Sequence, residues 1–392
     1  MVKSLYIHIP FCNEICSYCD FPKVFLKGQD VNGYVEALIT ELKIYEKTLD
    51  FSDLQTIYIG GGTPTVLTIA TLDKLFTYLH SVINFHQLVE VSIEANPESL
   101  TDPQKVAYLK RSGVTRISLG VQTFQEPYLQ ILNRSHSKKD VFKAINLLAA
   151  KNFEINLDMI YAIPTQTLAA WEADLNSLLQ LPITHLSAYS LILESHTKLH
   201  LDYLNDKLQL IDNEVEAQMF ELAINKLTNA SFKHYEISNF TKNKPSSHNL
   251  TYWQNEDYLG VGLGAHGALA RLPATEITKK APKAPPKIRY ENTRAITTYQ
   301  QALKNDKLPI INSATLTINE QLEESMFLGM RLLAGVNLHE LQNKYQVNLA
   351  ELYKPKLDKL RKLAYVHQEA GILKLTPKGL LMANDVFAEF LL

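Results

Sequence analysis

The sequence predicts an α/β protein built on parallel strands, and three observations support this fold class. Six short apolar or alternating runs, each typical of a strand, occur in the first half of the chain, with amphipathic helical stretches between them. Glycine and polar residues follow most of these runs directly. The 392 residues, 46% hydrophobic and 20% charged, also suffice for a sizeable globular core. Strands that alternate with helices imply βαβ units and a parallel sheet or barrel.

The predicted elements can be placed in order along the chain. Strands are expected at residues 5–9, 56–59, 89–94, 115–119, 155–158 and 185–191. Helices are expected at residues 32–47, 72–82, 101–113 and 168–181, and another starts after Ser137, where Asp140 completes a capping box. Six such repeats fall short of the eight that close a full (β/α)8 barrel.

All three cysteines of the chain, Cys12, Cys16 and Cys19, lie within eight positions directly after the first predicted strand. An odd cluster in a chain without other cysteines favours metal over disulfides. Structural zinc requires a fourth ligand, for which His8 is the candidate, although it lies in a strand-like alternating stretch. The C-x3-C-x2-C spacing instead allows three thiolates to hold three irons of a [4Fe–4S] cube, which leaves the fourth iron open.

Polar residues mark the carboxyl ends of the next predicted strands. Gly61, Gly62 and Thr63 follow the second strand, Glu94 ends the third, Gln122 follows the fourth and Asp158 ends the fifth. Each residue alone has a structural explanation, such as a turn glycine, a helix cap or a buried hydrogen-bond partner. Ligands bind at this edge in parallel α/β folds, so their joint placement predicts a binding site there.

The cysteine motif, with Tyr18 directly before its last cysteine, resembles the signature of the radical S-adenosylmethionine (SAM) superfamily. The stretch YIHIPFC…CSYCDF is similar to the anaerobic coproporphyrinogen III oxidase branch. Further matching blocks are GGGTPT (60–65), SIEANP (92–97), GVQTF (120–124), NLDMIYAIPTQT (156–167), YEISNF (235–240), HNLTYW (248–253) and YLGVGLGAH (258–266). The resemblance implies an open, partial (β/α)6 radical-SAM barrel and a C-terminal, mainly helical, winged-helix-like domain.

The resemblance also implies the cofactors and their ligands. Cys12, Cys16 and Cys19 would hold a [4Fe–4S] cluster whose open iron is chelated by SAM, and an electron donor would reduce the cluster. Glu94, Arg134 and Asp158 match the positions that hold the ammonium, carboxylate and ribose groups of SAM, although Arg134 also suits an exposed approach to a helix. The other matched SAM contacts are Tyr6, Tyr18, Gly61, Gly62, Thr63, Gln122, Ile192 and His266.

Two features separate the chain from the oxidases it resembles. Those enzymes carry a further cysteine two residues after the third, where this chain has Phe21, and the chain carries the HNLTYW block. Both match the HemW subfamily, so the resemblance implies a haem chaperone that passes haem to acceptor proteins. His248 of HNLTYW is then the candidate haem ligand, since imidazole is the common haem ligand. Without the subfamily match, His248 would be assigned to a turn cap.

Two other functions stay open at this point. The first is an oxygen-independent coproporphyrinogen III oxidase, or another radical-SAM enzyme acting on a tetrapyrrole. The second is a binding protein that keeps the cluster only for structure, which the complete set of SAM positions disfavours. Coproporphyrinogen III oxidase activity is not expected, and no catalytic residue is assigned.

Three regions are expected along the chain. Residues 1–205 form the radical-SAM core, and residues 206–292 form an extension that contains a helix at 213–229, the HNLTYW block and a basic, proline-rich loop at 271–289. This extension is expected across the open side of the barrel. Residues 293–392 form the C-terminal domain, helical from Ala295 until a short strand and turn near 371–377.

Charge and hydropathy limit the partners. The net charge of −2 provides no field that would draw the molecule to nucleic acid, so no nucleic-acid partner is expected. The start lacks the pattern of a signal peptide, and no stretch is long and apolar enough to span a bilayer, so a cytoplasmic location is expected. Peripheral membrane association with acceptor proteins and a homodimer are left open.

Overall fold

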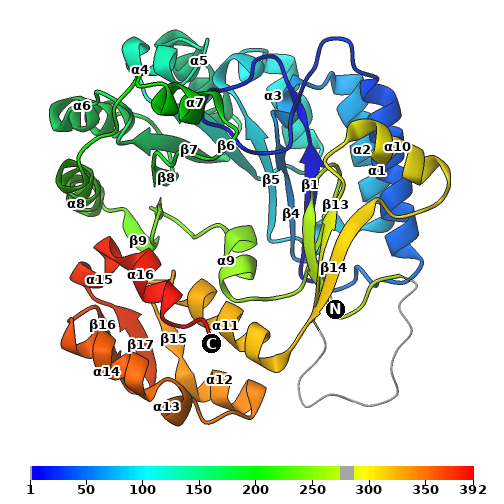
Figure 1. Cartoon of the computed structure of the whole chain (residues 1–392). Coiled ribbons are helices and arrows are strands. Elements are labelled where there is room, and N and C mark those ends of the chain that lie inside the picture. The colour runs from blue at the N-terminus through cyan, green and yellow to red at the C-terminus, as the bar shows by residue number, and fades with distance from the viewer. Residues whose placement is uncertain (1, 274–286) are drawn as a thin grey trace.

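The fold is organised around one large twisted sheet, which the computed structural model of residues 2–273 and 287–392 shows with its covering helices (Figure 1). Six of its strands are mutually parallel and hydrogen-bonded in chain order. They are β1 (Ser4–Ile9), β4 (Thr56–Gly61), β5 (Glu90–Ala95), β6 (Arg116–Gln122), β7 (Glu154–Tyr161) and β8 (His185–Ser190). The predicted α/β class and all six predicted strands are confirmed.

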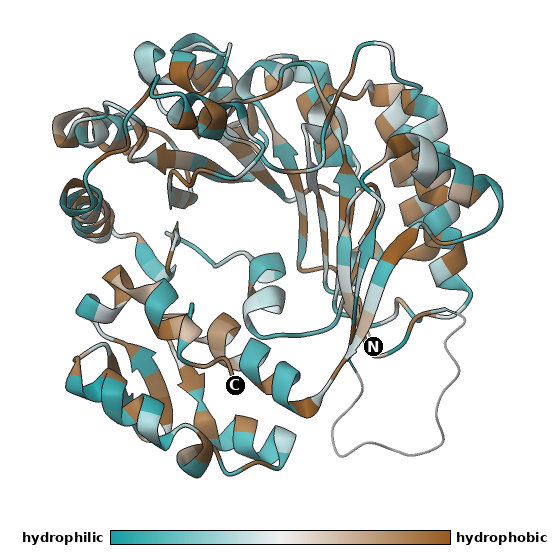
Figure 2. Ribbon diagram, viewed as in Figure 1, coloured by the Kyte–Doolittle hydropathy of each residue, from teal (hydrophilic) through white to brown (hydrophobic). Residues whose placement is uncertain are grey.

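Helices lie between these strands. They are α1 (Val31–Glu46), α2 (Ile69–Val82), α3 (Pro103–Arg111), α4 (Glu126–Ile131), α5 (Lys138–Ala149) and α6 (Leu168–Leu178). Helices α3 and α5 start at the predicted caps, whereas α2 starts three residues earlier than predicted and α4 was not predicted. Asp102 caps α3, and Ser137 with Asp140 forms the expected capping box of α5. Hydrophobic and hydrophilic residues alternate along these helices (Figure 2), and apolar side chains such as Leu38, Leu75 and Ile145 are fully buried in the main core.

Further strands bring the sheet to twelve strands within the described residues, and they lie at its two edges. Beyond β1 lie β11 (Tyr258–Val261), β12 (His266–Leu269), β13 (Lys287–Asn292) and β14 (Ile310–Leu316); beyond β8 lie β10 (Asn239–Thr241) and β9 (Lys233–Glu236). Strand β11 is parallel to β1, and β12 to β14 continue antiparallel. The expectation of helix from Ala295 to residue 371 is therefore wrong over β14, and also over two short strands, β15 (Val336–Asn337) and β16 (Val366–Glu369). The edge strand β14 is largely exposed, so backbone pairing with β13, and not a hydrophobic pattern, holds it.

The segment after β8 contains α7 (Lys198–Leu204) and α8 (Asn213–Asn229), the latter with the predicted bounds. Residues 206–270 also supply strands to both sheet edges, as well as α9 (Ser247–Trp253), which carries HNLTYW. Most of the predicted basic loop at 271–289 lies outside the described residues, because only 271–273 and 287–289 belong to them.

A buried ion pair fastens α9 to the sheet. Arg116 Nε lies 3.2 Å from Glu90 Oε2, and both side chains are almost fully buried. Glu90 also accepts hydrogen bonds from the hydroxyl of Ser246, which caps α9, and from the amide of Ser247. Burial alone would raise the pKa of Glu90, but the Arg116 charge and these hydrogen bonds lower it overall. The start of α9 is therefore fixed beside β5.

The C-terminal part has its own hydrophobic cluster, which includes Leu322, Met326, Leu357, Val386 and Phe390. A three-stranded sheet in the order β15 (Val336–Asn337), β17 (Ile372–Leu375), β16 (Val366–Glu369) packs with several helices. These helices are α11 (Ile318–Gly329), α12 (Leu338–Tyr345), α13 (Leu349–Leu352), α14 (Lys354–Lys362), α15 (Pro377–Leu381) and α16 (Ala383–Ala388). This agrees with the expected winged-helix-like domain and with the strand near 371–377.

The three-region division stays a prediction. Strands β13 and β14, which the boundary at residue 293 separates, pair with each other, and α10 (Ile296–Lys304) packs against α1. Residues 293–316 therefore contact the large sheet and its helices. No helix within the described ranges is long and apolar enough to cross a membrane.

We expect Glu90→Gln to lower the free energy of unfolding by roughly 3–5 kcal/mol, because it leaves the buried Arg116 charge uncompensated. Denaturant titration of the purified variant measures this change. The control is Lys354→Ala, which breaks an exposed 3.0 Å pair with Asp358 on α14 and should cost at most about 0.5 kcal/mol. Equal effects of the two variants would contradict the anchoring role of Glu90.

Candidate functional site

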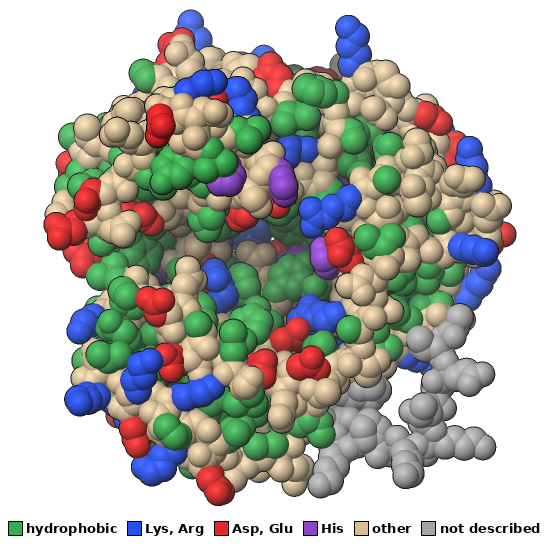
Figure 3. Space-filling view, viewed as in Figure 1, with side chains coloured by type: hydrophobic (Ala, Val, Ile, Leu, Met, Phe, Trp, Pro, Cys, Tyr) green, Lys and Arg blue, Asp and Glu red, His purple; other side chains and the backbone are tan. Residues whose placement is uncertain are grey.

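A cavity of about 760 Å³ lies at the carboxyl ends of the parallel strands. Figure 3 shows a hollow near the middle of one face, with hydrophobic, basic, acidic and histidine side chains around it. The structure brings every predicted cluster and SAM residue to the lining of this cavity. These residues are Tyr6, Cys12, Cys16, Tyr18, Cys19, Gly61, Gly62, Thr63, Glu94, Gln122, Arg134, Asp158, Ile192 and His266.

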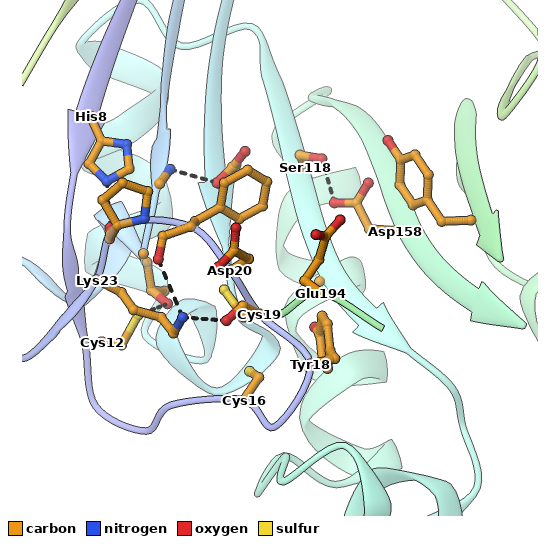
Figure 4. A pocket seen from close by; sticks show the side chains of 18 of the residues that line it. His8, Cys12, Cys16, Tyr18, Cys19, Asp20, Lys23, Ser118, Asp158 and Glu194 are labelled. Carbon is orange, nitrogen blue, oxygen red and sulfur yellow. Dashed lines mark hydrogen bonds between the residues drawn. The ribbon is translucent and has the colours of Figure 1, made fainter. Parts of the chain in front are cut away.

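The cysteine loop is held by backbone contacts on both sides of the barrel. Short strands β2 (Phe11–Cys12) and β3 (Val24–Phe25) pair at its base. Ser17 donates to the Ile131 carbonyl (2.7 Å) and accepts at its own carbonyl from the Leu199 amide (2.9 Å). Lys23 Nζ donates to the carbonyls of Cys19 and Phe21 (Figure 4). The loop therefore has a defined shape in which all three thiols line the same cavity.

The geometry around Cys12 fits a cluster held close to the glycine turn. A Cβ placed on Gly62 would lie 2.8 Å from Cys12 Sγ and equally close to the main chain of Pro10 and Phe11, so only glycine fits. Gly61 has a φ of 117°, which also favours glycine. Burial raises the pKa of the Cys12 thiol to about 11, so the thiolate form needs a compensating positive centre such as iron.

The zinc alternative lacks its fourth ligand. His8 Nε2 contacts the Pro22 carbonyl oxygen at 2.7 Å and Nδ1 contacts Tyr6 Oη at 2.9 Å, so both ring nitrogens have partners. In residues 2–273 and 287–392, no three Cys, His, Asp or Glu side chains are grouped to hold a single metal ion. A [4Fe–4S] cluster does not need such a single-metal site, because each cysteine binds a different iron of the cluster.

Glu94 is half-buried on the cavity wall at the end of β5. Its two carboxylate oxygens accept hydrogen bonds from Tyr58 Oη (2.8 Å) and the Gly61 amide (2.9 Å). Burial raises the pKa of Glu94 to about 7, although these hydrogen bonds oppose the shift. A cationic group of a ligand would favour its ionised form.

Asp158 and Arg134 complete the charged lining. Asp158 accepts from Ser118 Oγ (2.7 Å) and Asn156 Nδ2 (2.9 Å), and burial raises its pKa (Figure 4). Arg134 Nη2 donates to Asn96 Oδ1 at 2.9 Å and to the Gly120 carbonyl at 2.6 Å, while Nη1 lies 3.4 Å from Cys16 Sγ. Arg134 is thus a cavity residue and not part of an exposed helix approach.

His248 is the one predicted site residue that does not line the cavity. It is buried, Nδ1 contacts Thr56 Oγ1 at 2.8 Å and Nε2 contacts Tyr252 Oη at 2.8 Å. Burial lowers the pKa of His248 to about 4, so the ring is neutral. With both nitrogens occupied, the structure does not support the expectation that His248 ligates haem. Its neighbour on α9, Tyr252, lines the cavity instead.

Sequence reasoning missed several polar lining residues. Tyr58, Asn96 and Ser118 hold Glu94, Arg134 and Asp158, and Lys23 shapes the cysteine loop. Asn96 and Ser118 belong to or follow predicted strands, so their position in the pattern could have indicated them. Tyr58 lies inside β4, where only the pairing of neighbouring strands places it next to Glu94.

Family models match two parts of the chain. The "Radical SAM superfamily" model matches residues 6–178, and the "HemN C-terminal domain" model matches residues 316–382. The first contains the three cysteines and all the cavity residues up to Asp158. The second coincides with most of the separate C-terminal cluster.

Curated relatives extend over the whole chain. The "Heme chaperone HemW" proteins of Lactococcus lactis and Bacillus subtilis are each 38% identical and cover 100% of this chain, with 97% and 99% of their own lengths aligned. The bovine "Radical S-adenosyl methionine domain-containing protein 1, mitochondrial" is 30% identical over 96% of this chain and 83% of its own.

A solved structure confirms the fold. The coproporphyrinogen III oxidase HemN of Escherichia coli, which is a radical SAM enzyme, superposes with a TM-score of 0.82 over 100% of this chain and 90% of its own. Its sequence identity is 20%, so this similarity establishes the architecture alone.

We expect Gly62→Ala to reduce the iron and sulfide content of protein reconstituted without oxygen, because the new Cβ displaces Cys12 or the adjoining main chain. Gly28→Asn is the control: no heavy atom lies within 4 Å of its Cβ position, and asparagine tolerates the positive φ of 85°. A full complement of iron in Gly62→Ala would show that the cluster does not need this close approach.

Proposed function

The chain belongs to the HemW haem chaperone family of radical SAM proteins, and from this premise we propose that it binds haem and transfers it to acceptor proteins. The observation that carries the proposal is the full-length similarity to "Heme chaperone HemW" relatives, combined with Phe21 on the cavity rim. Phe21 occupies the position where the oxidases resembled here carry a fourth cysteine. Its phenyl ring can neither ligate metal nor transfer a proton, whereas it can pack against a porphyrin.

The radical SAM family implies a [4Fe–4S] cluster and SAM, which together supply reductive cleavage of the SAM sulfonium bond. In our proposal Cys12, Cys16 and Cys19 hold the cluster, with Gly61 and Gly62 giving it a close approach. Glu94 accepts the ammonium group of SAM. The remaining contacts are proposed as assigned from the sequence, with Arg134 on the carboxylate and Asp158 on the ribose.

The depth and the rim of the cavity differ in character, which supports two kinds of ligand in one site. Glu94, Asp158 and Arg134 are half-buried and hydrogen-bonded, as suits a polar cofactor held in one orientation. Phe21 and Ile192 are each 66% exposed at the rim, as suits an apolar cargo that enters and leaves.

The runner-up is a coproporphyrinogen III oxidase, or another radical-SAM enzyme acting on a tetrapyrrole. Such an enzyme would use the same barrel and the same SAM residues. The structural similarity that favours it has 20% sequence identity and therefore supports a shared fold but not a shared activity. The acceptor protein, the electron donor and the cytoplasmic location stay predictions.

The pKa of Glu94 gives a pH dependence for SAM binding. Below about pH 7 the carboxyl is neutral, and above it the carboxylate can pair with the ammonium group. We expect SAM affinity to rise by up to roughly tenfold per pH unit as pH increases towards 7, and then to level off. Changes in the electron paramagnetic resonance signal of the reduced cluster on SAM addition measure this affinity.

Glu94→Gln should weaken SAM binding above pH 7 by about ten- to a hundredfold, since a charge-assisted hydrogen bond contributes roughly 1.5–3 kcal/mol. The variant should also lose the pH dependence. A wild-type signal that saturating SAM leaves unchanged would rule out SAM on the cluster; an unaltered pH profile in Glu94→Gln would reassign the ammonium partner.

Haem binding and oxidase activity are best measured on the same anaerobically reconstituted protein. We expect about one haem per chain, seen in the haem absorption bands, and no conversion of coproporphyrinogen III when cluster, SAM and reductant are all present. Oxidase activity would appear as loss of two propionate carboxyl groups. Robust turnover without haem binding would reverse the ranking of the two functions.

A further inference from the structure

If the protein carries haem, an imidazole with a free nitrogen is the first ligand to seek, and His248 does not offer one. Among the described residues that line the cavity, the histidines are His8 and His266. His8 is buried and both of its ring nitrogens have partners within the cysteine loop and β1. His266 therefore remains as the imidazole that can reach an incoming ligand.

His266 begins β12 and its side chain is 55% exposed. The imidazole makes no hydrogen bond with the described residues, and its nearest charged partner is Glu291, whose Oε1 lies 3.7 Å from Nε2. The main chain of His266 is fixed, because it packs so closely on Gly260 that no Cβ would fit there. The backbone at this position is thus available to line the SAM pocket, while the side chain is free at the rim.

Apolar side chains flank the same opening. β12 lies beyond β1 and Ile192 follows β8, so His266 and Ile192 mark the two ends of the parallel section of the sheet. Phe21 lies on the cysteine loop, and its neighbour Pro22 lies close to Gly264, two residues before His266. The side chain of Arg294 also lies close to Gly264. Two large apolar side chains, each 66% exposed at a cavity rim, favour a ligand with an extended apolar face.

The charges at the rim fit a ligand that carries carboxylates on one side. Arg294 is exposed, and its Nε lies 3.3 Å from the same Glu291 oxygen that faces His266, which leaves its other N–H groups free for a carboxylate. Acidic Glu14, Asp20 and Glu194 also line the cavity, from the cysteine loop and from the segment after β8. Carboxylates are therefore expected on the Arg294 side.

We propose that His266 is an axial ligand of haem bound at the rim of the cavity, with the porphyrin against Phe21 and Ile192 and a propionate on Arg294. The proposal rests on the proposed chaperone function and specifies where the cargo binds. A coordinate bond forms between the haem iron and the lone pair of a His266 ring nitrogen, with no change in oxidation state. Glu291 orients the imidazole, as carboxylates commonly do for metal-bound histidines. This rim position leaves the haem within reach of an acceptor protein.

The test compares His266→Ala with a closely matched histidine. His367 on β16 is 62% exposed and its Nε2 also lies 3.7 Å from a glutamate oxygen, that of Glu369, but it belongs to the C-terminal cluster and does not line the cavity. Haem is titrated into cluster-loaded full-length protein. We expect His266→Ala to shift the haem absorption bands and to weaken binding by about tenfold or more. His367→Ala should behave as wild type.

Two further measurements separate ligation from general damage. Free imidazole added to haem-loaded His266→Ala should restore the wild-type bands, which a merely structural role would not allow. Ile192→Asp should weaken haem binding but keep the bands of His266 ligation. Iron content should stay at wild-type levels in all these variants, and the response of the cluster signal to SAM should stay at the wild-type level in His367→Ala, which lies outside the cavity.

The outcomes distinguish this proposal from the function on which it rests. A wild-type protein that binds no haem contradicts the chaperone function itself. Wild-type protein that binds haem while His266→Ala shows the same bands and affinity overturns the His266 site and leaves the chaperone function standing. Loss of the SAM response together with unchanged haem bands in His266→Ala would assign the side chain to SAM and also overturn the proposal.

Discussion

Parallel pairing of β1, β4, β5, β6, β7 and β8 is the constraint on which the site depends. Because these strands are in register, their carboxyl ends meet along one edge, where Glu94 pairs with Ser118 across β5 and β6, and Gly120 pairs with Asp158 across β6 and β7. The cysteine loop leaves β1 at the same edge and folds over the glycine turn after β4. A shift by one residue in any pair would turn these side chains to the other face of the sheet.

The half-buried carboxyl groups at this edge require compensation, and neighbouring strands of the barrel supply it. Glu94 is satisfied from β4 and its glycine turn, and Asp158 from β6 and β7. Hydrogen bonds reduce the cost of burial without removing it, so both carboxyl pKa values stay raised. A ligand with a positively charged group would therefore stabilise the ionised form of these carboxylates.

The elements at the edges of the sheet form much of the rim of the cavity. Strands β11 to β14 extend the sheet beyond β1 and bring His266 and Arg294 to the rim, while the segment after β8 brings Ile192 to the opposite end. Helix α9, fastened by Glu90 and Arg116, presents Tyr252 to the cavity and buries His248 behind it. The depth of the cavity thus belongs to the core barrel, and its rim belongs largely to the added elements.

The sequence by itself determined the α/β class, the six core strands and the caps of α3 and α5, and its resemblance to the radical SAM superfamily indicated the fourteen residues that line the cavity. These features depend on local hydrophobic period, on capping chemistry and on motif spacing, which a single chain segment carries. Only the tertiary structure decided the edge strands, since β11 pairs with β1 from about 250 positions away and β14 is an exposed edge without a hydrophobic pattern. The tertiary structure also decided the exposure of two histidines, because burial depends on which distant strands and helices pack around a residue. The side chain of His248 is enclosed by Thr56 and Tyr252, whereas that of His266 is exposed at the rim.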